Sequence, residues 1–64
     1  MTRKTLKEAR IAKGMTQQQV AEHLEIAPRH YQRIENGEAL GSIKQWDALE
    51  DLFSIHQRKL RELS

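Results

Sequence analysis

Three polar side chains that can pair with DNA base edges lie close together in the middle of the chain: Arg29, Gln32 and Arg33. Arg29 and Arg33 are four residues apart, so they share one face of an α-helix. Arginine is matched to guanine O6 and N7 in the major groove, and glutamine to adenine N6 and N7. If the apolar side of such a helix is buried, these three side chains point outward, which is the chemistry that a groove-reading helix needs.

Other residue types that support catalysis or metal binding lack the spacing that such sites require. His23, His30 and His56 are not spaced as metal ligands. The chain has no cysteine, and Ser54 with His56 has no third partner for nucleophilic catalysis. The carboxylates of the C-terminal half are typical of a solvated helix face: Asp47, Glu50 and Asp51. We therefore expect no enzyme, no metal or cofactor site, and no small-molecule ligand.

Four Ser or Thr residues are each followed three places later by Glu or Gln, which is the pattern of a capping box. The pairs are Thr5 with Glu8, Thr16 with Gln19, Ser42 with Gln45, and Ser54 with Gln57. In a capping box, the hydroxyl accepts from a free backbone N–H of the first turn, and the Glu or Gln accepts from the N–H of the cap residue. Each pair opens an amphipathic stretch, so the pattern predicts four helix starts.

Apolar residues recur at helical spacing, and no strand-like alternation is present. The first helix is expected from about Thr5, or earlier, to Lys13, with Gly14 ending it, and the second from Thr16 to about His23. The third begins with Pro28, whose missing N–H costs nothing in a first turn, and stops at Gly37. A fourth follows Ser42, and a short fifth covers about Ile55 to Leu63. The residues expected to face inward are Leu6, Ala9, Val20, Ala21, Leu24, Ala27, Tyr31, Ile34, Ile43, Trp46, Leu49, Leu52, Phe53, Ile55, Leu60 and Leu63.

Residues 16–36 hold two short helices separated by only about three residues. This gap is too short for antiparallel packing, so the two helices are expected to cross at a steep angle. Ala21 lies where they approach most closely, and a larger side chain there would push them apart. The arrangement is a helix-turn-helix unit.

Length and charge define the class of protein further. Sixty-four residues fit one domain, residues 1–64, which buries only about 60% of the surface of its unfolded chain. The net charge is +2, and basic residues are concentrated near the N-terminus: Arg3, Lys4, Lys7, Arg10 and Lys13. This distribution is compatible with a polyanion partner and also with ordinary solvated helix faces. No run of about 18 apolar residues is present, so no membrane span is expected. The lack of cysteine fits the cytoplasm.

Residues 16–37 resemble the helix-turn-helix of lambdoid phage repressors and Cro proteins, the XRE-like family. The resemblance covers about Leu6 to about Leu60 and is carried by Met15-Thr16-Gln17, Ala21 and Ile34-Glu35-Asn36-Gly37. It implies an all-α fold, a compact five-helix lambda-repressor-like domain with a central helix-turn-helix, whose third helix enters the major groove.

The resemblance also assigns roles to residues. Pro28, Arg29, Gln32 and Arg33 fall on positions that face bases, and Gln17 falls on a position that touches a phosphate. Arg10 and Glu35 match a pair that forms a structural ion bridge between the first and third helices. Three more residues are candidates for phosphate contact from their positions in the sequence: His30, Tyr31 through its hydroxyl, and Lys44 near the start of the fourth helix.

The sequence departs from the family pattern at two positions. Glu25 stands where a glycine is usual, so a left-handed backbone there would carry some strain. Ala27 precedes the third helix and cannot cap it, which costs about 1 kcal/mol relative to serine.

Two functions are compatible with these residues. The first is sequence-specific binding of a double-stranded DNA operator by a transcriptional regulator, a repressor in the simplest case. Relatives dimerise, and a homodimer would place two recognition helices about 34 Å apart. The second is a protein-interaction module, an adaptor or an antitoxin-like partner, because a fold alone does not define a function. The presence of Arg29, Gln32 and Arg33 favours the first.

Overall fold

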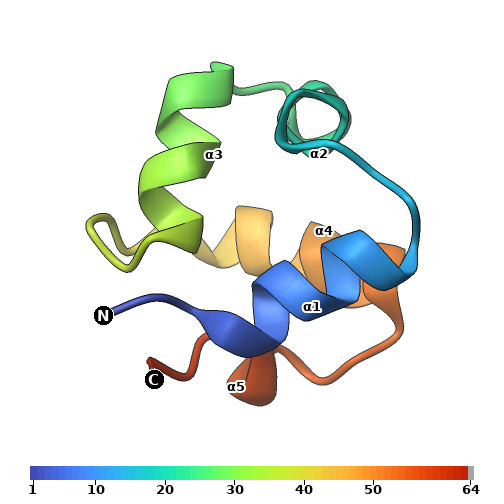
Figure 1. Ribbon diagram of the computed structural model, residues 1–64, viewed down its shortest axis with the longest axis vertical. Helices are drawn as coiled ribbons and strands as arrows, with labels where there is room; N and C mark the ends of the chain where they lie inside the picture. The colour runs from blue at the N-terminus through green and yellow to red at the C-terminus, as the bar shows by residue number, and fades with distance from the viewer. Residues whose placement is uncertain (64) are drawn as a thin grey trace.

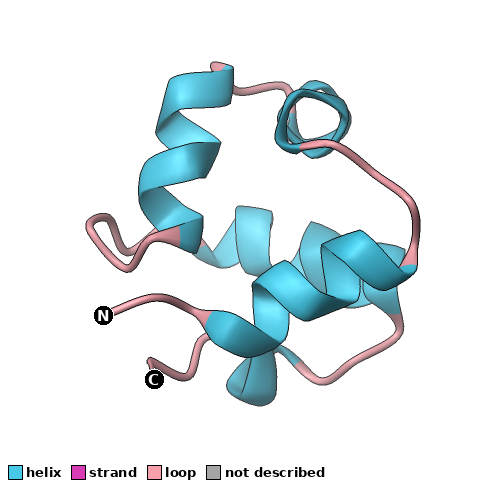
Figure 2. Ribbon diagram, viewed as in Figure 1, coloured by secondary structure: helices cyan, strands magenta, loops and turns pink. Residues whose placement is uncertain are grey.

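The computed structural model describes residues 1–63 and contains five α-helices in this range, with no strand (Figure 2). The helices are α1 (Lys4–Ala12), α2 (Gln17–Leu24), α3 (Pro28–Glu35), α4 (Ile43–Phe53) and α5 (Gln57–Leu60). The expected all-α, five-helix fold is confirmed. None of these helices is long and apolar enough to cross a membrane.

The two helices of the helix-turn-helix unit, α2 and α3, pack mainly against each other. Figure 1 shows α2 end-on and α3 from the side, so the two helices cross steeply, as the short gap between them predicts. α1 contacts α3 and α5, and α4 contacts α2 and α5. The two chain ends lie near each other, on the side where the loop after α3 turns toward α4 (Figure 1). The helix-turn-helix unit is thus held by α1, which contacts α3, and by α4, which contacts α2, and α5 packs against both α1 and α4.

The core is formed by the apolar positions that helical spacing predicts, and all five helices contribute to it. Its buried members are Leu6, Ala9, Val20, Ala21, Tyr31, Ile34, Trp46, Leu49, Phe53 and Leu60. Ala21 is fully buried at the crossing of α2 and α3. The indole Nε1 of Trp46 donates to the carbonyl oxygen of Leu40 at 2.8 Å, so this buried polar atom is satisfied.

Three apolar residues that were expected to face inward are exposed: Ala27, Ile43 and Leu63. Ala27 is the extended N-cap residue that precedes the first turn of α3, so it lies outside the buried stripe of that helix. Ile43 is 77% exposed because it is the first residue of α4, where the chain enters from an exposed loop and lies beyond the edge of the core. Leu63 is 49% exposed because α5 ends at Leu60, so the fifth helix does not reach it. Helical periodicity fails at all three places because it describes helix interiors, and these residues lie at or beyond helix ends.

Two of the four predicted capping boxes are confirmed. Thr16 Oγ1 accepts from the Gln19 N–H at 3.1 Å, and Gln19 Oε1 accepts from the Thr16 N–H at 2.9 Å. The same reciprocal bonds join Ser42 and Gln45, at 3.2 and 2.8 Å. These boxes fix the starts of α2 and α4.

The other two predicted boxes are wrong. α1 begins at Lys4, one residue ahead of Thr5, with Arg3 as its N-cap. Ser54 is the left-handed residue that ends α4, at φ 55°, and α5 is instead capped by His56, whose Nδ1 accepts from the Arg58 N–H. At α1 the N-cap residue Arg3 is held by long-range bonds to the end of α3, and at α5 a different local cap, the His56 imidazole, takes the place of Ser54.

Three helices end in the same hydrogen-bonded motif. After α1, α2 and α3, a left-handed residue (Gly14, Glu25 and Gly37) donates three residues back, and the next residue donates five residues back, which is the Schellman arrangement. Gly14 and Gly37 were predicted as helix ends. Glu25, at φ 60°, is confirmed as a non-glycine residue in this strained conformation. The Schellman bonds at Glu25 and Ile26 fix the direction in which the chain leaves α2 for the short turn to α3.

A comparison of two threonines tests the capping assignment. Thr16→Ala removes an N-cap hydroxyl and should lower the free energy of unfolding by about 1 kcal/mol. Thr5→Ala changes a residue inside α1, where alanine is the better helix former, so it should leave stability unchanged or slightly higher. Urea denaturation followed by circular dichroism measures both. Equal losses in the two variants would show that Thr16 is not a special cap.

Candidate nucleic-acid interface

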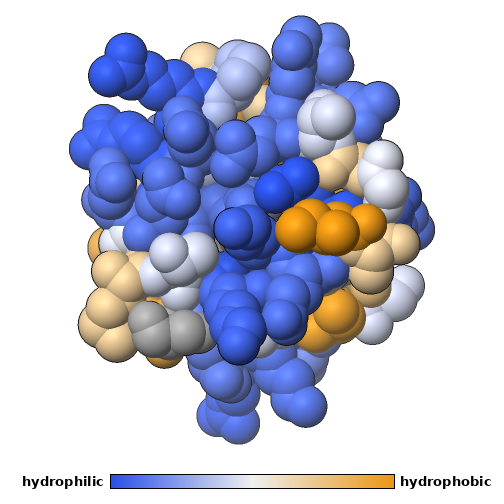
Figure 3. Space-filling model, in the orientation of Figure 1, coloured by the Kyte–Doolittle hydropathy of each residue, from blue (hydrophilic) through white to orange (hydrophobic). Residues whose placement is uncertain are grey.

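The outward face of α3 carries the three side chains that were predicted to read bases. Arg29, Gln32 and Arg33 are exposed, and together with Asn36 and Glu38 they line one shallow, polar hollow. Successive helical residues are about 100° apart, so positions 29, 32, 33 and 36 fall on one side of the helix. Figure 3 shows hydrophilic atoms over this part of the molecule, at the upper left. The structure thus brings the three predicted side chains to one surface.

The remaining predicted residues of α3 flank this surface. Pro28 is the first residue of the helix and is exposed, and His30 is exposed on the opposite flank. Ala27 has the extended backbone of an N-cap and makes no side-chain capping bond, as its residue type dictates. The first turn of α3 therefore rests on the fixed φ of Pro28 and on its packing.

Asn36 belongs to this surface and was not among the predicted site residues. It is half-buried at the C-terminal end of α3 and lines the same hollow as Arg33. Glu38 also lines it, with its Oε1 3.9 Å from Arg33 Nε; both side chains are more than half exposed. An exposed pair of this kind contributes little to stability and is easily exchanged for another anion.

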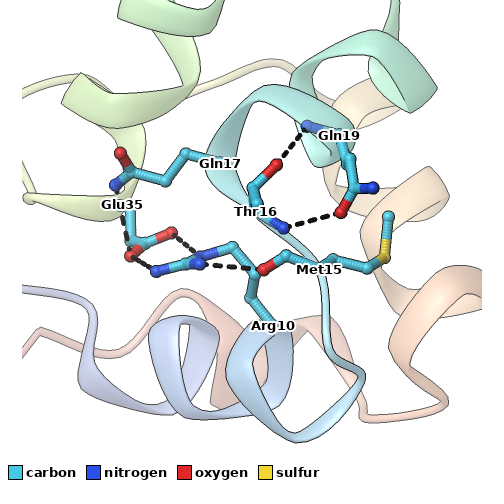
Figure 4. Close-up of polar contacts among 6 residues, drawn as sticks. All are labelled: Arg10, Met15, Thr16, Gln17, Gln19 and Glu35. Carbon is cyan, nitrogen blue, oxygen red and sulfur yellow. Dashed lines mark hydrogen bonds and ion pairs between the residues drawn. The ribbon is translucent and has the colours of Figure 1, made fainter.

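A buried carboxylate holds the C-terminal end of α3 to two other helices (Figure 4). Glu35 is 1% exposed and accepts two bonds from Arg10 of α1, from Nε at 2.9 Å and from Nη2 at 3.1 Å. Arg10 also donates to the carbonyl oxygen of Met15 at 2.9 Å, just before α2. The bond to Glu35 raises the pKa of Arg10. The ion pair that the resemblance implies is thus present in the structure.

Gln17, the predicted phosphate contact on α2, lies beside this ion pair. Its Nε2 donates to Glu35 Oε1 at a long 3.5 Å, and its side chain is half-buried (Figure 4). An amide nitrogen carries two N–H groups, so one remains free for an outside acceptor. The first residue of α2 is therefore oriented by the last residue of α3.

Tyr31 does not fit its predicted phosphate contact. The side chain is fully buried, and within residues 1–63 its hydroxyl has no hydrogen bond of good geometry. Burial, and then the nearby Glu35 carboxylate, raise its pKa, so the phenol stays neutral. The helical spacing that placed Tyr31 in the core also directs its hydroxyl inward, so the structure corrects this assignment.

Lys44 lies apart from the surface of α3. It is exposed in the first turn of α4 and lines a second hollow, together with His23, Glu25 and the cap residue Ser42. This hollow lies over the turn between α2 and α3. A phosphate contact by Lys44 stays a prediction, and it would belong to a different part of the interface.

Arg3 is a buried positioning residue that the sequence did not reveal. It is only 3% exposed, and its guanidinium donates to the carbonyl oxygens of Ile34 (2.6 Å), Ala39 (2.9 Å) and Arg61 (3.2 Å). It also stacks on the Trp46 ring, 5.2 Å from the centroid. These contacts join the N-terminal segment, the end of α3 and the C-terminal segment.

The burial of Arg3 changes the interpretation of the N-terminal charge. Desolvation, and then the charge of Arg61, lower the pKa of Arg3. Arg3 and Arg10 are both committed to internal contacts, whereas Lys4, Lys7 and Lys13 are exposed. Charge counting gave no signal for this difference, because each partner of Arg3 is a backbone carbonyl more than 30 residues away.

The fold and this surface define a helix-turn-helix domain of the DNA-binding type. A family model described as helix-turn-helix matches residues 6–56, and the chain belongs to this family, the XRE-type helix-turn-helix domains. No curated protein and no solved structure matches the chain. The family is a DNA-binding regulatory one and not a catalytic one. Within residues 1–63, no cluster of His, Asp or Glu is arranged to hold a metal ion.

The two ion pairs of Glu35 and Glu38 provide a matched stability test. Glu35→Gln leaves the largely buried Arg10 without a charged partner, so it should lower the free energy of unfolding by about 3 kcal/mol. Glu38→Gln breaks an exposed pair and should change it by less than about 0.5 kcal/mol. Thermal and urea unfolding measure both variants. A small effect of Glu35→Gln would show that the ion pair does not hold α3.

A second pair of variants tests Arg3. Arg3→Ala removes the donor to the carbonyls of Ile34, Ala39 and Arg61 and the cation above Trp46, so we expect a loss of about 2–3 kcal/mol. Lys4→Ala changes the exposed neighbour and should be within about 0.5 kcal/mol of the wild type. The prediction fails if both variants unfold at the same urea concentration.

Proposed function

We propose that the protein is a sequence-specific regulator of transcription that binds double-stranded DNA and reads the major groove with α3. The observation that carries the proposal is the common surface of Arg29, Gln32 and Arg33, on a helix whose opposite face is fixed in the core. A major groove about 12 Å wide admits one α-helix, and the side chains on its outer face meet the base edges. α3 has eight residues, so it presents about two turns.

Each side chain of the surface has a role in this proposal. Arg29 and Arg33 pair with guanines, Gln32 pairs with an adenine, and Pro28 offers apolar contact to a base edge such as a thymine methyl group. Gln17 and His30 contact phosphates on either side of the groove, and Lys44 contacts a phosphate further along the duplex. Glu38 releases Arg33 when DNA is bound, because the exposed pair is weak.

We propose a repressor as the simplest regulatory mode, because a domain that occupies an operator through α3 blocks other proteins from the same DNA. We propose further that it binds as a homodimer, with recognition helices about 34 Å apart on one side of the duplex. We also propose a location in the cytoplasm with the nucleoid, where a DNA-binding regulator meets its operator.

Selection of bound sequences from a random duplex pool tests the proposal. The wild type should enrich a palindromic site, and Arg29→Ala with Arg33→Ala should lose it. Each bidentate contact is worth about 1–3 kcal/mol, so the double variant should bind the selected site at least about 30-fold more weakly.

Two controls separate base reading from charge and from folding. Arg58→Ala with Lys59→Ala removes the same charge from exposed positions of α5 and should leave the selected sequence unchanged. Tyr31→Phe removes a buried hydroxyl and should bind like the wild type. If no sequence is enriched, or if the α3 variant enriches the same site as the wild type, α3 is not the reader and a protein-interaction role replaces this proposal.

A further inference from the structure

One carboxylate lies within the arginine-bearing surface of α3. The hollow on this surface is lined by Arg29, Gln32, Arg33, Asn36 and Glu38, and among these five residues Glu38 is the only acid. DNA carries phosphates along its grooves, so a carboxylate that faces a duplex is repelled and loses its water unless a hydrogen-bond donor meets it. Glu38 therefore needs a donor in a complex with DNA, and this need limits the sequences that suit it.

The backbone around Glu38 is fixed to the end of α3. The Glu38 N–H donates to the carbonyl oxygen of Arg33 at 2.8 Å, and the Ala39 N–H donates to the same oxygen at 3.2 Å. Gly37 is left-handed, at φ 81°, and turns the chain back toward the helix. The Ala39 carbonyl accepts from the buried guanidinium of Arg3 at 2.9 Å. The loop after α3 thus holds the base of the Glu38 side chain beside Arg33.

The charged ends of Arg33 and Glu38 are free to change partners. Arg33 Nε and Glu38 Oε1 are 3.9 Å apart, and the two side chains are 56% and 62% exposed. An exposed pair of this kind contributes little to stability, so it separates at small cost when each charge meets another partner. Because their backbones are joined by a hydrogen bond, the two side chains stay neighbours after the pair has separated. A cation and an anion therefore reach the same part of a groove together.

A G·C base pair presents matching groups in the major groove. Guanine O6 and N7 accept hydrogen bonds, which suits an arginine, and cytosine N4–H₂ donates one, which suits a glutamate. In an A·T pair the purine carries one acceptor and one donor, and thymine carries the O4 acceptor and a methyl group. A glutamate that faces thymine would therefore have no donor, and the arginine would meet a donor on adenine.

We propose that Arg33 and Glu38 together read one G·C pair, with Arg33 on the guanine and Glu38 on the cytosine amino group. This inference rests on the proposed DNA-binding function and adds a specificity-determining residue to it. In the free protein the two side chains pair with each other, and on the cognate site each exchanges its partner for a base. On other base pairs the carboxylate loses Arg33 without gaining a donor. Glu38 thus supplies the repulsive contact that discriminates against wrong sequences.

The first test is selection from the random duplex pool with single variants. Arg33→Ala and Glu38→Ala should both relax the preference at the same G·C pair and leave the other positions of the selected site unchanged. Glu38 is more than half exposed, so its replacement should not disturb folding. The matched control is Glu8→Ala, which removes the same charge from an exposed position of α1 and should select the wild-type sequence.

The second test removes the groove-facing N–H of cytosine from the selected duplex. N4-methylcytosine still pairs with guanine and leaves the guanine edge intact, but its methyl group takes the place of that N–H. The wild type should bind this duplex at least about fivefold more weakly, which is the lower end of the value of one base contact, and Glu38→Ala should bind both duplexes within about twofold. As the control duplex, 5-methylcytosine adds a methyl group and keeps the N–H, so the wild type should bind it within about twofold of the unmodified site.

Three results overturn the proposal. In the first, Glu38→Ala keeps the preference at every base pair. In the second, it binds all duplexes more tightly with an unchanged preference, which would mean that Glu38 only repels phosphates. In the third, it relaxes a different base pair from Arg33→Ala. DNA reading by α3 stands in all three cases if Arg29→Ala with Arg33→Ala loses the selected site. If the wild type enriches no sequence, the proposed function fails and this inference fails with it.

Discussion

The buried ends of two arginines fix the C-terminal end of α3, and the rest of the structure depends on that attachment. Glu35 at this end is bound by Arg10 of α1, and the last carbonyls of the helix are bound by Arg3. A helix of eight residues has little stability of its own, so its position must come from such contacts. Each bond also satisfies a charge or a carbonyl that would be costly to bury unpaired. The tertiary contacts therefore supply the rigidity that a reading helix requires.

This attachment divides α3 into two faces with separate tasks. Tyr31, Ile34 and Glu35 are buried and locate the helix, whereas Arg29 and Arg33 are exposed and free to meet a ligand. Because the inner face is committed, the outer side chains lose less freedom on binding than they would on a mobile segment. The hydrogen bond from Gln17 to Glu35 also orients the first turn of α2 relative to α3. Under the proposed function, base reading by α3 and phosphate contact by Gln17 would both depend on the position of one buried carboxylate, Glu35.

Arg3 connects the C-terminal end of α3 to Trp46 and to the C-terminal segment on the neighbouring side of the molecule. The same guanidinium caps the end of α3, stacks on Trp46 and holds the C-terminal segment through the Arg61 carbonyl. A chain of 64 residues has a small apolar core, so a buried cation with several carbonyl partners replaces part of what a larger core would provide.

The sequence by itself determined the features that arise from neighbouring residues. These are the helical class, the capping boxes at Thr16 and Ser42, the glycine-ended helices, most of the core, and the common face of Arg29 and Arg33. The tertiary structure alone decided the burial of Arg3, the inward hydroxyl of Tyr31, the exposure of Ile43, and the true start of α1. The physical reason is the range of the interactions: caps and periodicity act within a few residues, whereas the partners of Arg3 lie 31 to 58 residues away and meet it only when the chain has folded.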